Sequence, residues 1–233
     1  MKTTIRVLVC LFCILAAHPA RAITGYYNQS FYTGYNLFQD SFLSDNAALS
    51  NIFFPASTPV GTKVSLWNPT LNAFDITSEY LGGSVWTINF SLTPGTGAQL
   101  YTPSAFTNTF VGTVVNRDGT ILNSESVVEP PPFTGPAGLY LLGDKLPVNS
   151  TGDSLFMHVV GRLPQISEQI IRLDATTQTY VTSTSSGDGA WDIIPQLKYG
   201  EAAFFNIAAI PEPGFIAIGL MGGILLRKCR SRA

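Results

Sequence analysis

Side chains able to do acid–base or nucleophilic chemistry are scarce in this sequence of 233 residues, which holds two histidines and three cysteines. His158 stands in the apolar stretch of residues 154–160, which we expect to be a strand, and no Gly-x-Ser-x-Gly motif marks a nucleophile. A zinc site needs several good ligands, which one histidine remote from the cysteines does not supply. The sequence therefore predicts a structural role for His158, with no catalytic residue set, no metal site and no cofactor.

Paired carboxylates are the second candidate for chemistry, because two of them flanking a glycosidic bond can hydrolyse it. Asp188 and Asp192 lie four residues apart, as do Asp75 and Glu79. On a strand, such residues share a face at ~13 Å, beyond the ~5–9.5 Å that either mechanism needs. Both pairs are therefore predicted to be turn or surface residues. An extracellular type of calcium site stays open because the loops contain Asp and Asn, although no Asp-x-Asp-x-Asp-Gly loop occurs.

The three tryptophans raise the question of stacking on sugar rings. Trp86 and Trp191 recur in similar surroundings 105 residues apart, which is typical of one core residue in each of two repeated units. Trp67 precedes Asn68 and Pro69 at the expected end of a hairpin, where a side chain is more exposed. Trp67 is therefore the candidate glycan contact.

The elements that position these residues have the pattern of β-structure. Stretches rich in Val, Ile, Thr and aromatic residues are separated by turns such as residues 116–119, and residues 43–53 are the best candidate for a short helix. From Ile23 to Ile210 the chain has six basic and 14 acidic residues, hence a charge of −8, and no cysteine. This composition excludes nucleic-acid binding through a basic surface, and it excludes disulfides within this region.

The sequence repeats itself at an offset of 104 to 106 residues. Four blocks match in the same order: residues 33–38 with 137–142, 61–74 with 167–180, 84–88 with 189–193, and 92–98 with 197–203. We therefore expect an all-β protein of two similar modules, residues 23–110 and residues 111–209, each a β-meander forming a small barrel or a sandwich. The second module carries an insertion at residues 129–132, expected to be a proline-rich surface loop.

Each unit resembles a small β-module of bacterial secreted and surface proteins. The matching features are Gly-x-Asn-Leu at residues 34–37, the Trp-Asn-Pro hairpin that begins at Trp67, and the Gly-x-Trp strand that ends at Trp191. The second unit departs from the pattern at Leu173 and Ala202, where the module prefers Trp and Gly. The resemblance implies an exported location and carries no catalytic residue set.

The N-terminus has the three parts of a secretory signal peptide. Lys2 and Arg6 precede an apolar run over residues 7–17, and Ala20 and Ala22 occupy the −3 and −1 positions of an Ala-x-Ala cleavage site. The run is shorter than the ~20 residues that a membrane span needs. We predict that residues 1–22 are a signal peptide.

The C-terminal segment, residues 210–233, also has three parts in order. Pro211, Glu212 and Pro213 precede an uncharged apolar run from Phe215 to Leu226. The basic stop that follows contains Arg227, Lys228, Arg230 and Arg232. The run would give a transmembrane helix of only ~18 Å against a hydrocarbon core of ~30 Å, which suits a temporary hold in the membrane better than a permanent anchor. A plain C-terminal membrane anchor is the alternative.

This tail resembles the PEP-CTERM sorting signal of bacterial surface proteins. The resemblance implies recognition by an exosortase, a membrane-tethered intermediate held transiently at the inner membrane, and a final location at the cell surface or in the extracellular matrix. It also implies a bacterium that makes exopolysaccharide or biofilm matrix.

The sequence therefore predicts a non-enzymatic exported matrix protein. Its expected partners are the exosortase and exopolysaccharide or other matrix components, with no nucleic acid. A polysaccharide-binding module at the same location is the alternative interpretation, and an uncharacterised secreted hydrolase is the third.

Overall fold

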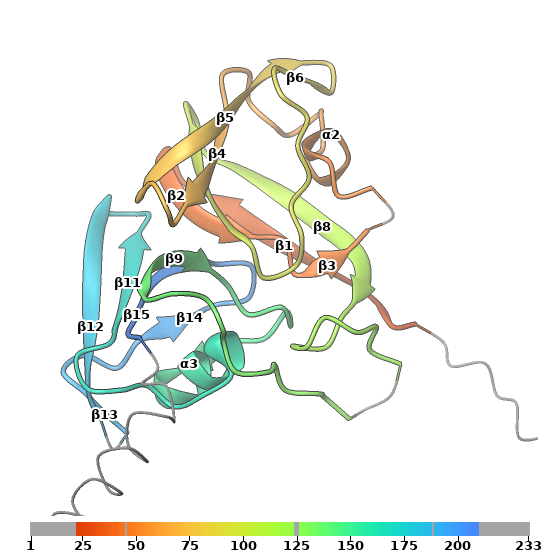
Figure 1. Cartoon of the computed structure of the whole chain (residues 1–233). Helices are drawn as coiled ribbons and strands as arrows, with labels where there is room; N and C mark the ends of the chain where they lie inside the picture. The colour runs from red at the N-terminus through yellow and green to blue at the C-terminus, as the bar shows by residue number, and fades with distance from the viewer. Residues whose placement is uncertain (1–21, 45, 124–125, 188, 210–233) are drawn as a thin grey trace, which may run out of the picture.

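The computed structural model describes residues 22–209, apart from residues 45, 124–125 and 188. Residues 1–21 of the predicted signal peptide and the whole predicted sorting segment lie outside the described residues. Strands dominate the described part and its helices are short, so the prediction of an all-β fold is confirmed (Figure 1).

The N-terminal half contains a five-stranded antiparallel sheet, which we name sheet I, in the order β2-β7-β4-β5-β6. Its strands are β2 (Gly34–Gln39), β4 (Lys63–Asn68), β5 (Ala73–Gly82), β6 (Val85–Trp86) and β7 (Gly97–Thr102). In β4, the buried Val64 alternates with the exposed Lys63 and the partly exposed Ser65, so one face of the sheet points into a core.

The C-terminal half contains a second five-stranded antiparallel sheet, sheet II, in the order β13-β12-β11-β15-β9. Its strands are β9 (Gly138–Leu142), β11 (Gln169–Asp174), β12 (Thr179–Gly187), β13 (Ala190–Trp191) and β15 (Ala203–Ile207). Counted from β9, this order corresponds strand for strand to that of sheet I. In each sheet, the last strand along the chain lies between the first and the second.

The backbone of the two sheets corresponds in register and in turn conformation. Lys63 pairs with Tyr101 in sheet I, and Gln169 pairs with Asn206 in sheet II. Positive φ angles recur at offsets of 105 or 106 residues: Gly61 with Ser167, Asn72 with Gln178, Gly82 with Gly187, Ser84 with Gly189, and Gly95 with Gly200. The offset changes where Asp75 forms a β-bulge in β5, because β12 pairs with β11 without an extra residue.

A third sheet, in the order β1-β8-β3, completes the N-terminal half. Its strands are β1 (Thr24–Phe31), β8 (Phe106–Val114) and β3 (Phe42–Leu43). Its apolar side chains share one core with sheet I and with helix α2 (Leu49–Ile52), which lies within the expected helical stretch. The largest members of this core are Tyr27, Phe31, Phe38, Phe42, Phe53, Tyr80, Trp86 and Phe110. The expected boundary between residues 110 and 111 falls inside β8, which pairs with β1.

Helix α3 (Gly152–Val160) covers the core face of sheet II, so the expectation of a strand over residues 154–160 is wrong. Leu155, Phe156 and Val160 are buried, and their spacing places them on one side of the helix. Gly161 ends the helix in the left-handed conformation, with φ of 76°. A short apolar run fits a strand or a helix equally well, and this cap is the signal that could have separated them. The remaining strands, β10 (Ser150–Thr151) and β14 (Gln196–Leu197), pair beside the helix.

Sheets I and II are joined by reciprocal hydrogen bonds. The Gln39 N–H donates to the Gly200 carbonyl at 2.9 Å, and the corresponding Gly143 N–H donates to the Gly95 carbonyl at 3.1 Å. Two isolated bridges repeat this relation, Phe38 with Glu201 and Leu142 with Thr96. An exchange of equivalent contacts is the pattern of an approximate two-fold axis between the halves.

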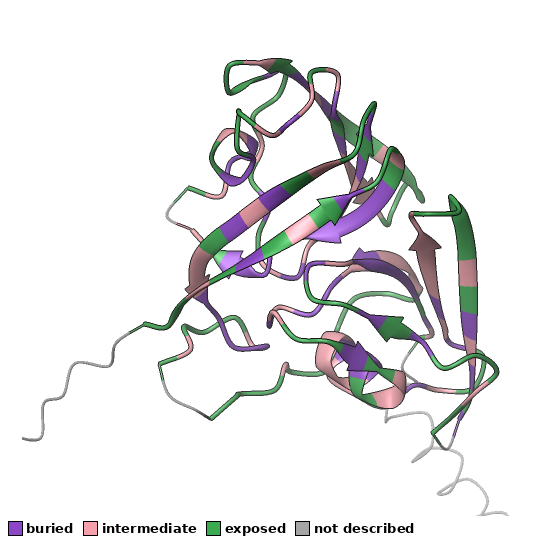
Figure 2. Cartoon of the chain, turned by 180° about the vertical axis from the view of Figure 1, so that it is seen from behind, coloured by how far each residue is buried: buried purple, intermediate pink, exposed green. Residues whose placement is uncertain are grey.

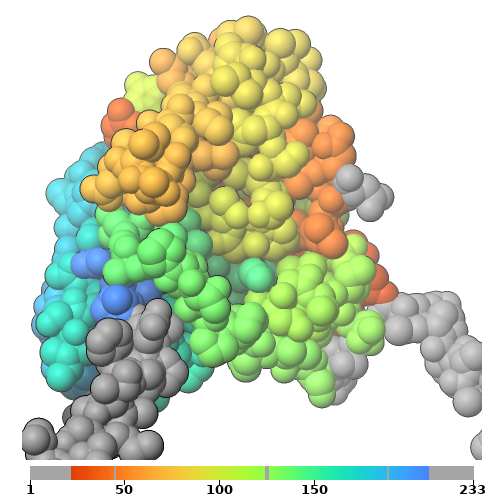
Figure 3. All heavy atoms as spheres, viewed as in Figure 1, coloured from red at the N-terminus to blue at the C-terminus, as the bar shows by residue number. Residues whose placement is uncertain are grey.

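A small apolar cluster fills the space between the two sheets. Leu37 of sheet I and its counterpart Leu141 of sheet II are both buried in it, together with Ala202 and Phe204. Figure 2 shows buried residues on the strands where the halves face each other, and Figure 3 shows the N-terminal half closely packed above the C-terminal half. This packing holds the two halves in a fixed position relative to each other, so the surface that they form together is also fixed.

Candidate functional site

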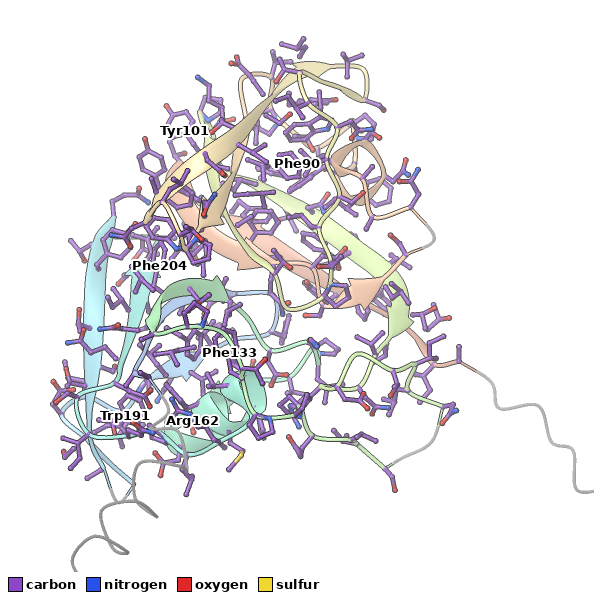
Figure 4. All side chains as sticks on the ribbon, in the orientation of Figure 1. Phe90, Tyr101, Phe133, Arg162, Trp191 and Phe204 are labelled. Carbon is purple, nitrogen blue, oxygen red and sulfur yellow. The ribbon has the colours of Figure 1, made fainter. Side chains whose placement is uncertain are left out.

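Trp67, the predicted glycan contact, lies near the end of β4 where sheet I meets sheet II. Its indole N–H donates to the Leu139 carbonyl at 2.7 Å. Its ring contacts the edges or faces of Phe74 and Phe204 at centroid distances of 5.1 and 4.9 Å. Figure 4 shows Phe204 at this junction. Trp67 thus wedges the two sheets together with its polar atom occupied, and its binding of a glycan stays a prediction.

The other two tryptophans pack in the cores of the two halves. Trp86 is buried against Phe53, at a centroid distance of 5.5 Å. Trp191 packs at 6.4 Å from Phe156 and donates its indole N–H to Asp153 at 2.8 Å. Phe53 lies four residues after the first residue of α2, and Phe156 lies four residues after the first residue of α3. Each half therefore repeats a contact between Phe and Trp.

His158 belongs to a buried ionic network that sequence reasoning missed. Asp144, whose side chain is 6 % exposed, accepts from the Arg117 guanidinium at 3.1 Å and from the Ser150 hydroxyl at 3.1 Å. The His158 Nδ1 lies 3.3 Å from the same carboxylate and 3.1 Å from the Ser150 oxygen. Arg117 also pairs with Glu129 of the proline-rich loop at 3.0 Å. The network ties the turn after β8 to helix α3.

The connections within this network differ from those of a nucleophilic triad. In a triad, the serine contacts one ring nitrogen of histidine and the carboxylate orients the other. Here Ser150 and Asp144 both lie at Nδ1, and Ser150 is 4 % exposed. Burial lowers the pKa of His158 below its ordinary value, and the Arg117 charge adds to that effect against the opposing influence of Asp144. The arrangement favours a neutral imidazole that holds structure.

A pocket of about 390 Å³ opens beside this network. Its lining includes Arg117, Lys145, His158, Pro131 and Phe133. The guanidinium of Arg117 on its wall is turned toward carboxylates, since it contacts Asp144 and Glu129. The proline-rich loop is largely exposed, as expected, and it forms one side of the pocket.

The two predicted carboxylate pairs have structural partners. Asp75 accepts from the Asn68 amide at 2.7 Å, and Glu79 pairs with Lys63 at 3.5 Å. Asp192 accepts from the Thr184 N–H at 2.7 Å, and this hydrogen bond lowers the pKa of Asp192. Asp188 lies outside the described residues. The interpretation of these carboxylates as turn and surface residues agrees with the contacts of the three that are described.

An open hollow of about 480 Å³ lies on the outer face of sheet I. Its lining comprises Tyr35, Lys63, Ser65, Thr77, Gln99 and Tyr101. These six residues lie on four neighbouring strands, and their register places all six on the face of sheet I opposite the core. Sequence reasoning missed this cluster, although the two-residue spacing of Lys63 and Ser65, and of Gln99 and Tyr101, places each pair on one face of its strand and was a usable signal. In Figure 4, Tyr101 lies on the outer side of the N-terminal half.

Within residues 22–209, apart from the gaps given above, no group of three or more His, Cys, Asp or Glu side chains is placed to hold a metal ion. None of the helices in that same part of the chain is long and apolar enough to cross a membrane.

The fold and its surface define an all-β protein with two sheets of equal topology, an internal ionic network and a tyrosine-lined hollow. No protein-family model, curated protein or solved structure matches the chain.

Proposed function

We propose that the protein is an exported, non-enzymatic component of the bacterial cell surface or extracellular matrix, sorted through a PEP-CTERM and exosortase route. One observation carries the proposal. Pro211-Glu212-Pro213, the apolar run to Leu226 and the terminal cations follow one another in a chain that begins with a signal-peptide pattern. Exopolysaccharide or another matrix polymer is the proposed environment of the folded part.

The architecture supports an adhesive or structural role through its repetition. We infer that sheets I and II are two copies of one module, because strand order, register and five positive-φ positions correspond. Tandem β-modules without cysteine suit an exported chain that must be stable through burial alone. The charge of −8 between Ile23 and Ile210 suits a hydrated matrix rich in cations.

The contacts of His158 support the non-enzymatic assignment over a secreted hydrolase. Ser150 is buried and donates to Asp144, so its oxygen is neither exposed to a substrate nor activated by a base on Nε2. The carboxylates of Asp75, Glu79 and Asp192 are each engaged by a neighbouring group.

Localisation of a truncated chain tests the proposal. We expect deletion of residues 211–233 to abolish processing and to change the fraction of the cell in which the protein accumulates. Substitution of Pro211, Glu212 and Pro213 by alanine should do the same with the apolar run intact. Pro132→Ala, in the exposed proline-rich loop, is the matched control and should behave as the unaltered chain. Unchanged location and unchanged mass of the tail variants would refute the sorting route.

The tyrosine-lined hollow favours a second function at the same location, the binding of a polysaccharide. Its aromatic rings can stack on the apolar face of a sugar ring, and the hydroxyl, amide and amine groups beside them can hydrogen-bond to the sugar hydroxyls.

A further inference from the structure

The hollow on sheet I differs from its counterpart on sheet II. Because the two sheets share one register, each lining residue has a structural equivalent. The equivalents of Tyr35, Lys63, Ser65, Thr77, Gln99 and Tyr101 are Leu139, Gln169, Ile171, Thr182, Phe204 and Asn206. Leu139, Ile171 and Phe204 belong to the apolar cluster between the sheets. The tyrosine pair is therefore a property of the first sheet alone, and the fold does not require it.

Two tyrosines form the aromatic part of the hollow. Tyr35 of β2 and Tyr101 of β7 are direct cross-strand partners, with ring centroids 5.3 Å apart and an angle of 58° between the rings. They are 48 % and 36 % exposed. Tyr180, from β12 of the other half, is 52 % exposed and lies near enough to Gln99 and Tyr35 to interact with both side chains. Exposed rings in this number on a rigid sheet offer an apolar surface to a flat ligand.

Polar groups surround these rings and keep capacity for a ligand. The hydroxyls of Ser65 and Thr77 lie 2.8 Å apart, and each hydroxyl has further lone pairs after that single bond. Gln99 of β7 pairs with Ser65 of β4 and lies two residues before Tyr101, so its amide lies between the two hydroxyls and the Tyr101 ring. The hollow thus combines ring faces with hydroxyl and amide groups, and its volume falls within the range of small-molecule sites.

The position of Tyr35 is fixed by the second half of the molecule. The Gln178 side chain accepts from the Tyr35 N–H at 2.7 Å and donates to the Tyr35 carbonyl at 2.9 Å. A side chain on Gly34 would meet the Gln178 amide at 2.6 Å, so glycine at residue 34 allows this contact. Gln178 itself holds a positive φ of 57°. The hollow is therefore preorganised only when both halves are folded together.

The charges of the hollow and of the surrounding protein favour an uncharged ligand over an anionic one. Among the described residues that line the hollow, Lys63 is the cation, and it pairs with Glu79 at 3.5 Å. The region from Ile23 to Ile210 carries −8, which repels polyanions. A phosphate or an acidic polymer would lack a free positive partner at this site.

We propose that the hollow formed by Tyr35, Ser65, Thr77, Gln99 and Tyr101 binds the pyranose rings of an uncharged polysaccharide. The apolar face of a sugar ring lies on Tyr35 and Tyr101, and the sugar hydroxyls bond to Ser65, Thr77 and Gln99. This inference rests on the proposed matrix function, whose polymer it specifies. It moves the glycan contact from Trp67 to the tyrosines, since the Trp67 ring and N–H are already engaged between the sheets.

The test is native affinity electrophoresis of the full-length chain in gels containing dextran, galactomannan, hydroxyethylcellulose or the acidic polymer alginate, followed by calorimetric titration. We expect at least one of the three neutral polymers to retard the protein. Tyr101→Ala and Tyr35→Ala should each weaken that binding by about tenfold, and Tyr101→Phe should retain it within a few-fold. Asn206→Ala, at the equivalent exposed position of sheet II, is the matched control and should bind as the unaltered chain.

Several outcomes would overturn the assignment. These are the absence of retardation by all three neutral polymers, retardation by alginate alone, binding that survives Tyr101→Ala, and equal loss in Asn206→Ala. Binding of poly-L-proline that depends on Tyr101, without binding of a neutral polysaccharide, would assign the hollow to a peptide instead. Urea unfolding of each variant checks that the fold is intact. The sorting route is tested separately by deletion of the tail, so either proposal can fail while the other stands.

Discussion

Asp40 should make the protein less stable at neutral pH than in mild acid. This carboxyl lies between β2 and β3, is 2 % exposed, and accepts from the Phe42 N–H at 2.9 Å. Burial raises the pKa of Asp40 from 3.8 to about 7, against the opposing effect of that hydrogen bond. The folded state therefore keeps a proton that the unfolded chain has already released between these two pH values.

The magnitude follows from the difference in pKa. Stabilisation by the protonated Asp40 is fully present below pH 3.8 and is lost as the pH rises through about 7, which amounts to about 4 kcal/mol of unfolding free energy. Asp40→Asn cannot ionise and keeps an oxygen for the Phe42 N–H. Its new amide donor costs about 1–3 kcal/mol if unpaired, and this cost is the same at every pH.

The assay is urea unfolding followed by tryptophan fluorescence at pH 4, 6 and 8. The free energy of unfolding of Asp40→Asn, relative to the unaltered protein, should rise by about 4 kcal/mol from pH 4 to pH 8. Asp75→Asn, at an exposed aspartate on β5, is the control for the substitution itself. If the Asp40→Asn difference changed by less than about 1 kcal/mol, Asp40 would already be ionised at pH 4 and the argument from burial would be wrong.

The other expected outcomes concern the junction of the halves and the ionic network. Trp67→Phe should cost about 1–2 kcal/mol in urea unfolding, because a carbonyl of β9 loses its donor, and an unchanged midpoint would contradict the wedge role. Asp144→Ala should cost about 3–5 kcal/mol by removing the buried partner of the Arg117 guanidinium, which then keeps only the half-exposed Glu129, and full stability in this variant would mean that water replaces the carboxylate. Gly97→Ala should lower the melting temperature, since the new methyl group would lie 2.9 Å from the backbone of β9. The lowered pKa of His158 means that the unfolded chain takes up a proton first as the pH falls below 6.5, so stability drops there, and His158→Gln should reduce that drop.

The sequence predicted the strands and their repetition because both depend on local patterns. Turn residues such as Gly82 and Gly187 recur at one offset, and the sheets keep the same register there. Helix α3 was missed because nine residues are too few for periodicity to separate a helix from a buried strand. The cap at Gly161 was the better evidence.

The candidate sites were harder to predict because they depend on contacts between distant segments. Trp67 was expected at an exposed hairpin end, and the approach of sheet II with Phe204 leaves it partly buried. The tyrosine hollow needs Gln178 to fix Tyr35, across 143 residues of sequence. No local pattern specifies which outward-facing residues of a sheet stay uncovered, since that depends on where the second sheet docks.

The place of β15 in sheet II has a consequence for the order in which the chain can become complete. β15 is the last described strand along the chain, yet it lies inside the sheet, between β11 and β9. A chain interrupted before Ala203 would leave both neighbours with unpaired edges, which are sites for aggregation and proteolysis. Sheet II can therefore be completed only when the chain is present as far as Ile207. Until then, the unpaired edges of β9 and β11 stay open to proteases and to aggregation.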